Sequence, residues 1–362
     1  MEERRSSPVE LLWDLVFAFA VTQVTTLLRA HLSWGGFGKS MLVLGLVWWA
    51  WSAFVWVVNA QNEPSRTVTL ALLIAMGFIF VAGLALPDAF GSRAVLFATT
   101  YVVVRLIHLG LYVYESRLGN ASRSSILGFT FTSLIGFALL LVGAFTHGGV
   151  RVALWVAALA IDFGGPALFS RERLRGLQEV AVTHFSERYG LFVIICLGES
   201  IIAIGTGARP LSAHRVEAVA LCLAITVALW WAYFDELAEE AEQTLRKHKD
   251  AVLAAVDSYS YIHVLLVAGI IVFAVGARRL VHAGAGELGD PGRLALCGGI
   301  ALYLVGLAAF KQRLLGELEP LKLITAAALL LVGWLGGGLA ALAVAGIAIG
   351  ILAAAHIATR LV

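Results

Sequence analysis

The chain contains twelve apolar stretches of roughly twenty residues each, the length that an α-helix needs to cross the hydrocarbon core of a bilayer. They lie approximately at 9–29, 39–60, 67–86, 93–115, 125–147, 150–169, 186–207, 214–236, 258–281, 293–312, 321–335 and 338–358. The connections between them are too short to form a separate soluble domain. The sequence therefore predicts an all-α polytopic membrane protein with about 12 transmembrane helices. The glycine break at 336–338 and the short stretch before it leave a range of 10–12 open.

Composition excludes the other classes of protein. Hydrophobic residues make up 60% of the chain and charged residues 14%, whereas a soluble domain carries roughly 25% charged residues. Intrinsic disorder requires the opposite composition. The net charge of +2 gives no reason to expect a nucleic-acid partner. We expect the partners to be the lipid bilayer and a small ion or solute, and a homo-oligomer is compatible with this composition.

Lysine and arginine are distributed unevenly over the connections. With a cytoplasmic N-terminus, the inner connections carry sixteen of these residues and the outer ones nine. By the positive-inside rule this predicts that both termini are cytoplasmic. Glu10 and Asp14 lie within the first apolar stretch, where signal peptides avoid charge, so we expect a retained first span.

The second half of the chain repeats features of the first. The sequence WWAW at 48–51 matches WWAY at 230–233, and LLIAMGFIFVAG from Leu72 matches LLVAGIIVFAVG from Leu265. Two further pairs follow in the same order, and all four offsets lie between 182 and 193 residues. Six spans per half give both halves the same orientation. We therefore predict two parallel six-helix repeats, 1–175 and 176–362, with a site or pathway at their interface.

Ionisable residues within the spans are the main functional candidates, because charge at bilayer depth is costly. Glu10 and Asp14 are four residues apart and share one helical face. The candidate ion- or substrate-interacting residues are Glu10, Asp14, Arg105, His108, Asp162, His184, Glu187, Arg188, Glu199, Asp235 and His263. Most fall in the cytoplasmic third of the bilayer, which indicates a polar vestibule open to the cytoplasm. Arg105 and Glu199 lie near the midplane, where an ion pair between them would neutralise both charges.

Several of these residues also have a structural interpretation. A carboxylate in the first turn of a helix is stabilised by the helix dipole, which applies to Glu10 and Glu187. Arg188 at an inner helix end fits a topology anchor. Tryptophans that fit packing and interface anchors better than a cofactor cage stand at positions 48, 49, 51, 56, 230 and 231.

A metal site is a weaker alternative. Di-iron bundles use a Glu-x-x-His motif on facing helices, whereas this chain has the reverse order, His184-x-x-Glu187, in one copy. With His263, these two residues are the metal-ligand candidates. The sequence has no nucleophile elbow, phosphate loop or zinc signature, so we expect neither catalytic residues nor a cofactor.

Two segments resemble a known family. ELLWDLVFAFAVTQ at 10–23 resembles the E-L-F-F-D-L-V-F-V-F-A-x-T-Q opening of the low temperature requirement protein A (LtrA) family, with Leu12-Trp13 where two aromatics are usual. HFSERYGLF at 184–192, followed by LGES at 197–200, resembles that family's H-F-x-E-R-x-G-L-F…L-G-E-S segment. The similarity covers nearly the whole chain. It implies a polytopic protein of the bacterial inner membrane, without a defined biochemical activity.

A second resemblance concerns architecture. WDLVFAFAVT at 13–22 is similar to the F-S-D-G-V-F-A-I-A-I-T first helix of potassium channels built on six-helix repeats. The arginine that precedes this motif in those channels is replaced by Pro8.

These observations favour a transporter or channel for a small ion or solute, not an enzyme. The groups that interact with protons or cations would be Glu10, Asp14, Glu187 and Glu199, with His184, His263 and Arg105 as their partners. One alternative is an intramembrane enzyme that acts on a lipid or isoprenoid, with the carboxylates as general acids or metal ligands. A further alternative is a protein of stress adaptation whose polar residues only hold helices together.

Overall fold

The computed structural model describes residues 6–60, 65–169, 171–175, 177–208 and 210–361, and the regular elements in these ranges are helical. The long helices are α1 (Pro8–Ala30), α2 (Trp34–Asn59), α3 (Arg66–Ala85), α4 (Ala94–Leu118), α5 (Arg123–Ala144), α6 (Gly148–Phe169), α8 (Val182–Gly207), α9 (Ala213–Phe234), α12 (His263–Ala283), α13 (Asp290–Leu314), α14 (Pro320–Leu335) and α15 (Ala341–Leu361). The short elements are η1 (Leu86–Asp88), α7 (Arg171–Leu174), α10 (Ala238–Lys247), α11 (Ala251–Ala255) and the π-helical η2 (Val256–Ile262).

Each predicted apolar stretch corresponds to one long helix, which confirms the all-α polytopic fold. Eleven helices of the described ranges are long and apolar enough to cross a membrane, and α14, with 16 residues, is shorter. The glycine break after α14 is a turn, in which Gly338 has a φ of 77°. Glycine adopts this left-handed conformation without strain.

The chain forms two compact units. Unit 1 comprises Met1–Tyr189 and Arg246–Val256, and unit 2 comprises Gly190–Leu245 and Asp257–Val362. The first turns of α8 therefore belong to unit 1, and the rest of that helix belongs to unit 2. The two six-helix repeats remain a prediction.

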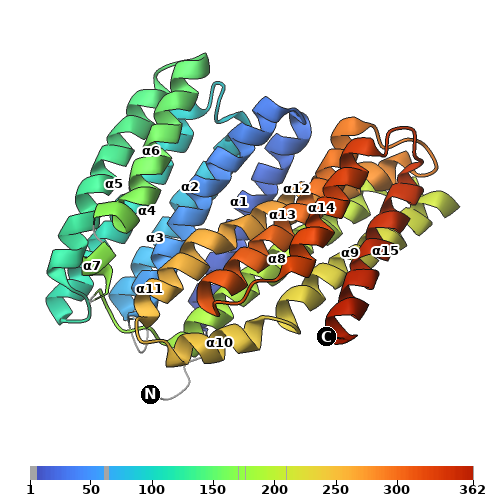
Figure 1. Cartoon of the computed structure of the whole chain (residues 1–362). Helices are drawn as coiled ribbons and strands as arrows, with labels where there is room; N and C mark the ends of the chain where they lie inside the picture. Colours follow the sequence, from blue (N-terminus) through green and yellow to red (C-terminus); the bar gives the residue numbers. More distant parts are fainter. Residues whose placement is uncertain (1–5, 61–64, 170, 176, 209, 362) are drawn as a thin grey trace. The chain divides into compact units, whose positions relative to one another are not determined.

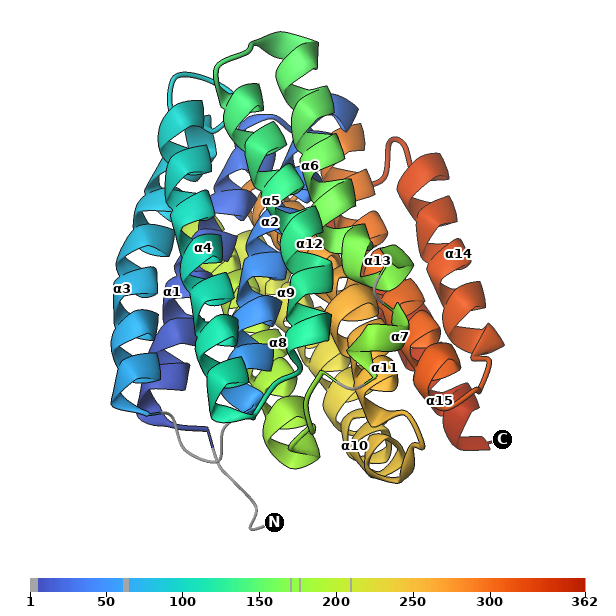
Figure 2. The same ribbon diagram turned by 90° about the vertical axis from the view of Figure 1, so that its left-hand side faces the viewer.

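In unit 1, α2 is the central helix. Of the apolar stretch of α2 that is long enough to cross a membrane, 89% is buried, because the helix contacts α1, α4 and α6. α3 packs against α1 and α4, and α5 packs against α6 (Figure 1; Figure 2). α2 is apolar around its whole circumference, as expected of a helix buried on every side.

In unit 2, α12 and α13 pack closely along a line of glycines. A Cβ atom added at Gly276 would overlap the backbone of Leu296, and one at Gly299 would overlap the backbone of Phe273. Such small residues let membrane helices approach backbone to backbone. α14 packs on α13, and α15 packs on α14 and α9 (Figure 1).

Candidate functional site

Four ionisable residues of α1 and α8 form one buried group in unit 1, which we call the carboxylate cluster: Glu10, Asp14, His184 and Arg188. Each helix contributes two residues that are four positions apart and therefore lie on one face. All four are at most 1% exposed. The structure thus brings together four of the residues that the sequence singles out.

Arg188 lies between the two carboxylates of the cluster. Its Nη2 donates a hydrogen bond to Asp14 Oδ1 over 2.6 Å, and its Nη1 lies 3.4 Å from Glu10 Oε1. Arg188 is 1% exposed, so it is part of the site and not only an anchor at the membrane surface. A buried arginine is expected to be paired in this way, because an isolated charge is costly in a medium of low polarity.

Glu10 combines a structural and an electrostatic role. Its Oε2 accepts the backbone N–H of Ser7 in a capping box that starts α1, at 2.5 Å. This agrees with the expected role in the first helical turn. Its Oε1 lies 2.9 Å from His184 Nε2 and faces Arg188. Glu10 thereby couples the start of α1 to α8.

The tautomer of His184 follows from the hydrogen bonds of Asn59. Asn59 Oδ1 accepts the backbone N–H of Ala181 and its Nδ2 donates to the Ala181 carbonyl, which fixes the orientation of the amide. Asn59 Nδ2 also lies 3.2 Å from His184 Nδ1, so this ring nitrogen is an acceptor. The proton of a neutral imidazole is then on Nε2, which donates to Glu10.

Asp14 is the member of the carboxylate cluster with an incomplete set of hydrogen bonds. Asp14 Oδ1 accepts hydrogen bonds from Arg188 and from Trp51 Nε1, the latter over 2.8 Å. Asp14 Oδ2 is buried and has no hydrogen-bond partner among the described residues. Asp14 Oδ2 is therefore the oxygen of the cluster that is left to accept a proton.

Aromatic rings surround this cluster and exclude water. The Trp51 ring packs against Trp48 and Tyr189 at centroid distances of 5.1 and 4.8 Å. The Tyr189 hydroxyl shares a hydrogen bond of 2.7 Å with the Ser52 hydroxyl. An apolar environment of this kind strengthens electrostatic interactions and raises the cost of an unpaired charge.

A second buried pair lies near the middle of α4 and α6 in unit 1. Arg105 Nη2 lies 3.1 Å from Asp162 Oδ1, and Ser133 Oγ of α5 donates to the same oxygen over 2.6 Å. The Arg105 guanidinium also lies over the rings of Trp49 and Phe137, at 5.8 and 5.6 Å. This pair is neutral, and the two rings add cation–π attraction.

His108, one turn beyond Arg105 on α4, lies among aromatic rings. Its ring centroid is 5.6 Å from that of Phe54 and 5.0 Å from that of Tyr112. Neither ring nitrogen has a hydrogen-bond partner in the part of the chain that the structure describes. His108 thus borders the Arg105–Asp162 pair without an ion pair of its own.

The other candidate residues lie elsewhere. Glu187 is exposed on α8, although its neighbours on both sides along that helix face are buried. Glu199 is 9% exposed and belongs to unit 2, so an ion pair between it and Arg105 remains a prediction. Asp235 is exposed, and its Oδ2 accepts Trp231 Nε1. His263 is buried in unit 2 and is 3.1 Å from the Tyr233 hydroxyl.

Among residues 6–60, 65–169, 171–175, 177–208 and 210–361, no group of three or more His, Cys, Asp and Glu side chains is placed to hold a metal ion. The carboxylate cluster has three such residues, but Arg188 occupies the space between the two acids. The cluster is therefore better suited to a proton or a monovalent cation than to a transition metal.

Three polar partners were not among the sequence candidates. Trp51 binds Asp14, Asn59 orients His184, and Ser133 binds Asp162. The interpretation of Trp51 as a packing residue is correct in part, but it does not include the indole hydrogen bond. No sequence signal distinguishes Trp51 from the neighbouring tryptophans, because α2 is apolar on every face.

Comparison with known proteins identifies relatives of the whole chain. The model of a family described as bacterial low temperature requirement A protein (LtrA) matches residues 5–357. An uncharacterized protein of Rhizobium meliloti (strain 1021) is 31% identical over 327 residues, which cover 86% of this chain and 78% of that protein. No solved structure gives a significant match.

Proposed function

This chain belongs to the bacterial low temperature requirement A (LtrA) family, and from that premise we propose that it transports a small ion or solute across the inner membrane. The transport step would be coupled to a proton or a monovalent cation at the carboxylate cluster. The helices α1–α6 and α8–α15 provide the polytopic scaffold that such a protein needs.

The observation that carries this proposal is the buried, unpartnered Oδ2 of Asp14 in the carboxylate cluster. Asp14 is shielded from water, and this oxygen has no hydrogen-bond partner among the described residues. Burying a charged group without a partner costs several kcal/mol or more, which favours uptake of a proton or another cation at this oxygen.

We propose roles for three members of the cluster. Asp14 carries the exchangeable proton on Oδ2, because its Oδ1 is already occupied by Arg188 and Trp51. When that proton leaves, a monovalent cation must replace it or the buried negative charge is unpaired. Glu10 and Arg188 hold α1 and α8 together at the site. This obligatory replacement is what couples one ion to another in an exchanger.

The cluster also lies at the correct depth for access from one side. Glu10 and His184 are each the third residue of their helices, so they lie close to one membrane face. The uneven distribution of lysine and arginine over the connections supports a cytoplasmic position for that face. We therefore propose that both termini are cytoplasmic and that protons enter the cluster from that side.

The test is ion flux through proteoliposomes that contain the purified protein and a pH-sensitive dye. A panel of Na⁺, K⁺ and other monovalent gradients is imposed, and proton movement is followed. The wild type is expected to move protons against at least one of these gradients. Asp14→Asn is expected to abolish the coupled flux, because an amide resembles the protonated acid but cannot release a proton.

The matched control is Glu172→Gln, a change of the same chemical kind at a carboxylate of unit 1 that is 78% exposed. It is expected to retain full flux. Folding of each variant is checked by size-exclusion chromatography and thermal unfolding. A folded Asp14→Asn protein with wild-type flux would show that the cluster is structural. Absence of flux in the wild type across the whole panel would reject transport.

A further inference from the structure

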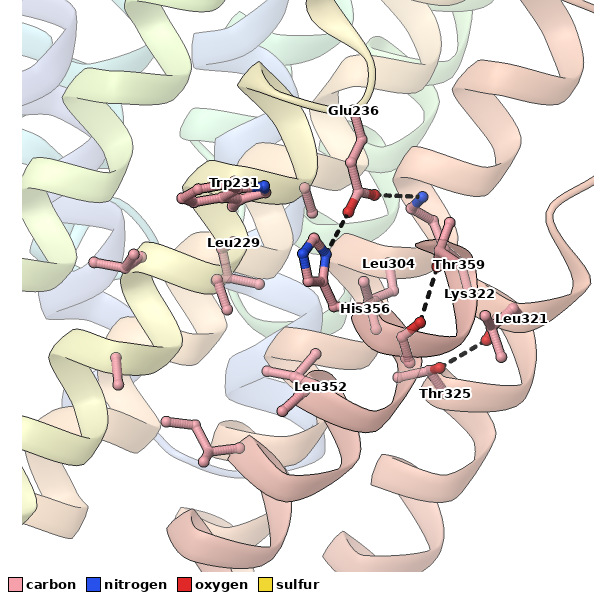
Figure 3. Close-up of a pocket in the computed structure, with 17 residues that line it drawn as sticks. Leu229, Trp231, Glu236, Leu304, Leu321, Lys322, Thr325, Leu352, His356 and Thr359 are labelled. Atoms are coloured by element: carbon pink, nitrogen blue, oxygen red, sulfur yellow. Dashed lines mark hydrogen bonds and ion pairs between the residues drawn. The ribbon is translucent and has the colours of Figure 1, made fainter. Parts of the chain in front are cut away.

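Unit 2 contains a cavity of about 400 Å³ between α9, α14 and α15, with Leu304 of α13 at its base. This volume lies within the range of cavities that hold small organic molecules. The hollow exists because three alanines of α9 that are four residues apart, at positions 224, 228 and 232, face it with short side chains. Leu229, Ile349 and Leu352 complete the apolar wall (Figure 3).

One end of the cavity is charged, and it carries both signs. Glu236 Oε2 lies 3.0 Å from Lys322 Nζ, and Glu236 Oε1 lies 3.0 Å from His356 Nδ1 (Figure 3). Arg360 Nε donates to His356 Nε2 over 3.1 Å, and Arg360 Nη2 is 3.5 Å from Asp235. Glu236, Lys322 and His356 therefore put one acidic and two basic side chains at this end of the cavity, and Arg360 and Asp235 lie beside them.

The charged end lies where the helices end, and the apolar part lies along their spans. Glu236 is the second residue after the end of α9, Lys322 is in the first turn of α14, and His356 is in the last two turns of α15. In a membrane protein such helix ends lie at the level of lipid headgroups, and Trp231 at the rim fits that position. The cavity therefore has the polarity of a phospholipid along its length.

We propose that this cavity binds one hydrocarbon chain of a zwitterionic phospholipid, whose headgroup is held at the charged end. The phosphate would be bound by Lys322 and Arg360, and the ammonium group by Glu236 and Asp235. Lys322 donates to Glu236 and forms an ion pair with Glu319, which leaves one of its three N–H groups for a phosphate oxygen. An anionic lipid would meet the same two carboxylates without an ammonium group to offset them, so it should bind more weakly. This inference depends on the cavity alone and does not rest on the proposed transport function.

The experiment uses the full chain, purified in detergent and stripped of native lipid. Phosphatidylethanolamine or phosphatidylglycerol with 16-carbon chains is added back, and bound lipid is counted by native mass spectrometry. The wild type is expected to retain one phosphatidylethanolamine per chain, with at least a fivefold preference over phosphatidylglycerol. Equal or stronger binding of phosphatidylglycerol, or lipid that dissociates as readily as detergent, would overturn the proposal.

Two kinds of variant distinguish binding of the lipid hydrocarbon chain from binding of the headgroup. Ala228→Phe fills the apolar part and is expected to lower lipid occupancy at least tenfold, whereas Ala220→Phe, on an exposed part of α9 outside the cavity, should leave it unchanged. If Ala228→Phe does not fold, Ala353→Leu on α15 fills the same space with a smaller side chain. The double variant Glu236→Gln/Lys322→Gln should retain a lipid but lose the preference between headgroups. Unchanged occupancy in the folded cavity-filling variant refutes the site.

Discussion

The carboxylate cluster of unit 1 and the charged end of the cavity in unit 2 are organised in opposite ways. The members of the cluster lie within α1 and α8, are at most 1% exposed, and include Asp14 Oδ2, which has no hydrogen-bond partner among the described residues. At the charged end of the cavity, Glu236, Lys322 and His356 lie at or near helix ends and are partly exposed. A charge of the cluster is therefore more costly to leave without a partner.

This difference indicates what each arrangement is for. Ion pairs at helix ends contribute little to stability, and they orient helices and headgroups at modest cost. Breaking a buried ion pair is far more costly, because it leaves a charge without a partner away from water. The contrast supports the proposed ion site in unit 1 and the proposed lipid site in unit 2.

The largest effect is expected from Arg188→Met. This change leaves Glu10 and Asp14 as two buried carboxylates without a guanidinium, which costs about 3–5 kcal/mol when one partner of a buried pair is removed. The protein should unfold at a much lower temperature in detergent, or fail to accumulate. Thermal unfolding followed by tryptophan fluorescence measures this loss.

A second-site change provides the control for this prediction. Arg188→Met combined with Asp14→Asn removes one charge of each sign and should restore most of the lost stability. If the double variant is as unstable as Arg188→Met, the loss is due to packing of the arginine side chain and not to its charge.

The second effect, smaller than the first, is expected from Asp162→Asn. Arg105 would lose its ion-pair partner but keep the rings of Trp49 and Phe137, so we expect a loss of roughly 2–3 kcal/mol. Chemical unfolding in mixed micelles measures it. The double variant Arg105→Met/Asp162→Asn should lose less free energy of unfolding than the two single variants lose together. Strict additivity would mean that the two side chains do not interact.

Much of this organisation could be predicted from sequence. Runs of about twenty apolar residues define the spans, because no other structure satisfies backbone hydrogen bonds in a bilayer. The four-residue spacing of Glu10 and Asp14, and of His184 and Arg188, places each pair on one helical face. Depth alone, however, does not identify a partner. Within unit 1, Arg105 pairs with Asp162, and depth did not single out this partner because it carries no information on lateral position.

The partners on α2 were beyond prediction for a different reason. A helix that is buried on all sides has no polar face to show which residue points toward α1. The choice of Trp51 as the partner of Asp14 depends on the rotation of α2, which is fixed by the packing of its neighbours. The cavity in unit 2 likewise depends on where α15 packs against α9, and the alanine spacing alone does not predict it.

A smaller effect is expected from Lys322→Met at the mouth of the cavity. Lys322 pairs with Glu236 and Glu319, but both carboxylates are within reach of solvent, so the loss should be about 1 kcal/mol or less. Thermal unfolding in detergent gives the value, and Lys311→Met, at the neighbouring ion pair with Glu319, serves as a matched control. A loss as large as that of Arg188→Met would contradict the distinction between the two units.

The smallest effect is a pH dependence at Glu319, which lies between α13 and α14. Burial would raise the pKa of its carboxyl group, but the ion pairs with Lys322 and Lys311 outweigh burial and hold the pKa below its ordinary value of 4.5. The folded protein then binds fewer protons than the unfolded chain, so this stabilisation is complete above pH 4.5 and is lost as the pH falls through the lowered pKa. The difference in unfolding temperature between wild type and Glu319→Gln should therefore be constant near neutral pH and shrink in acid. A difference that grows on acidification would mean that Glu319 is not stabilised by these lysines.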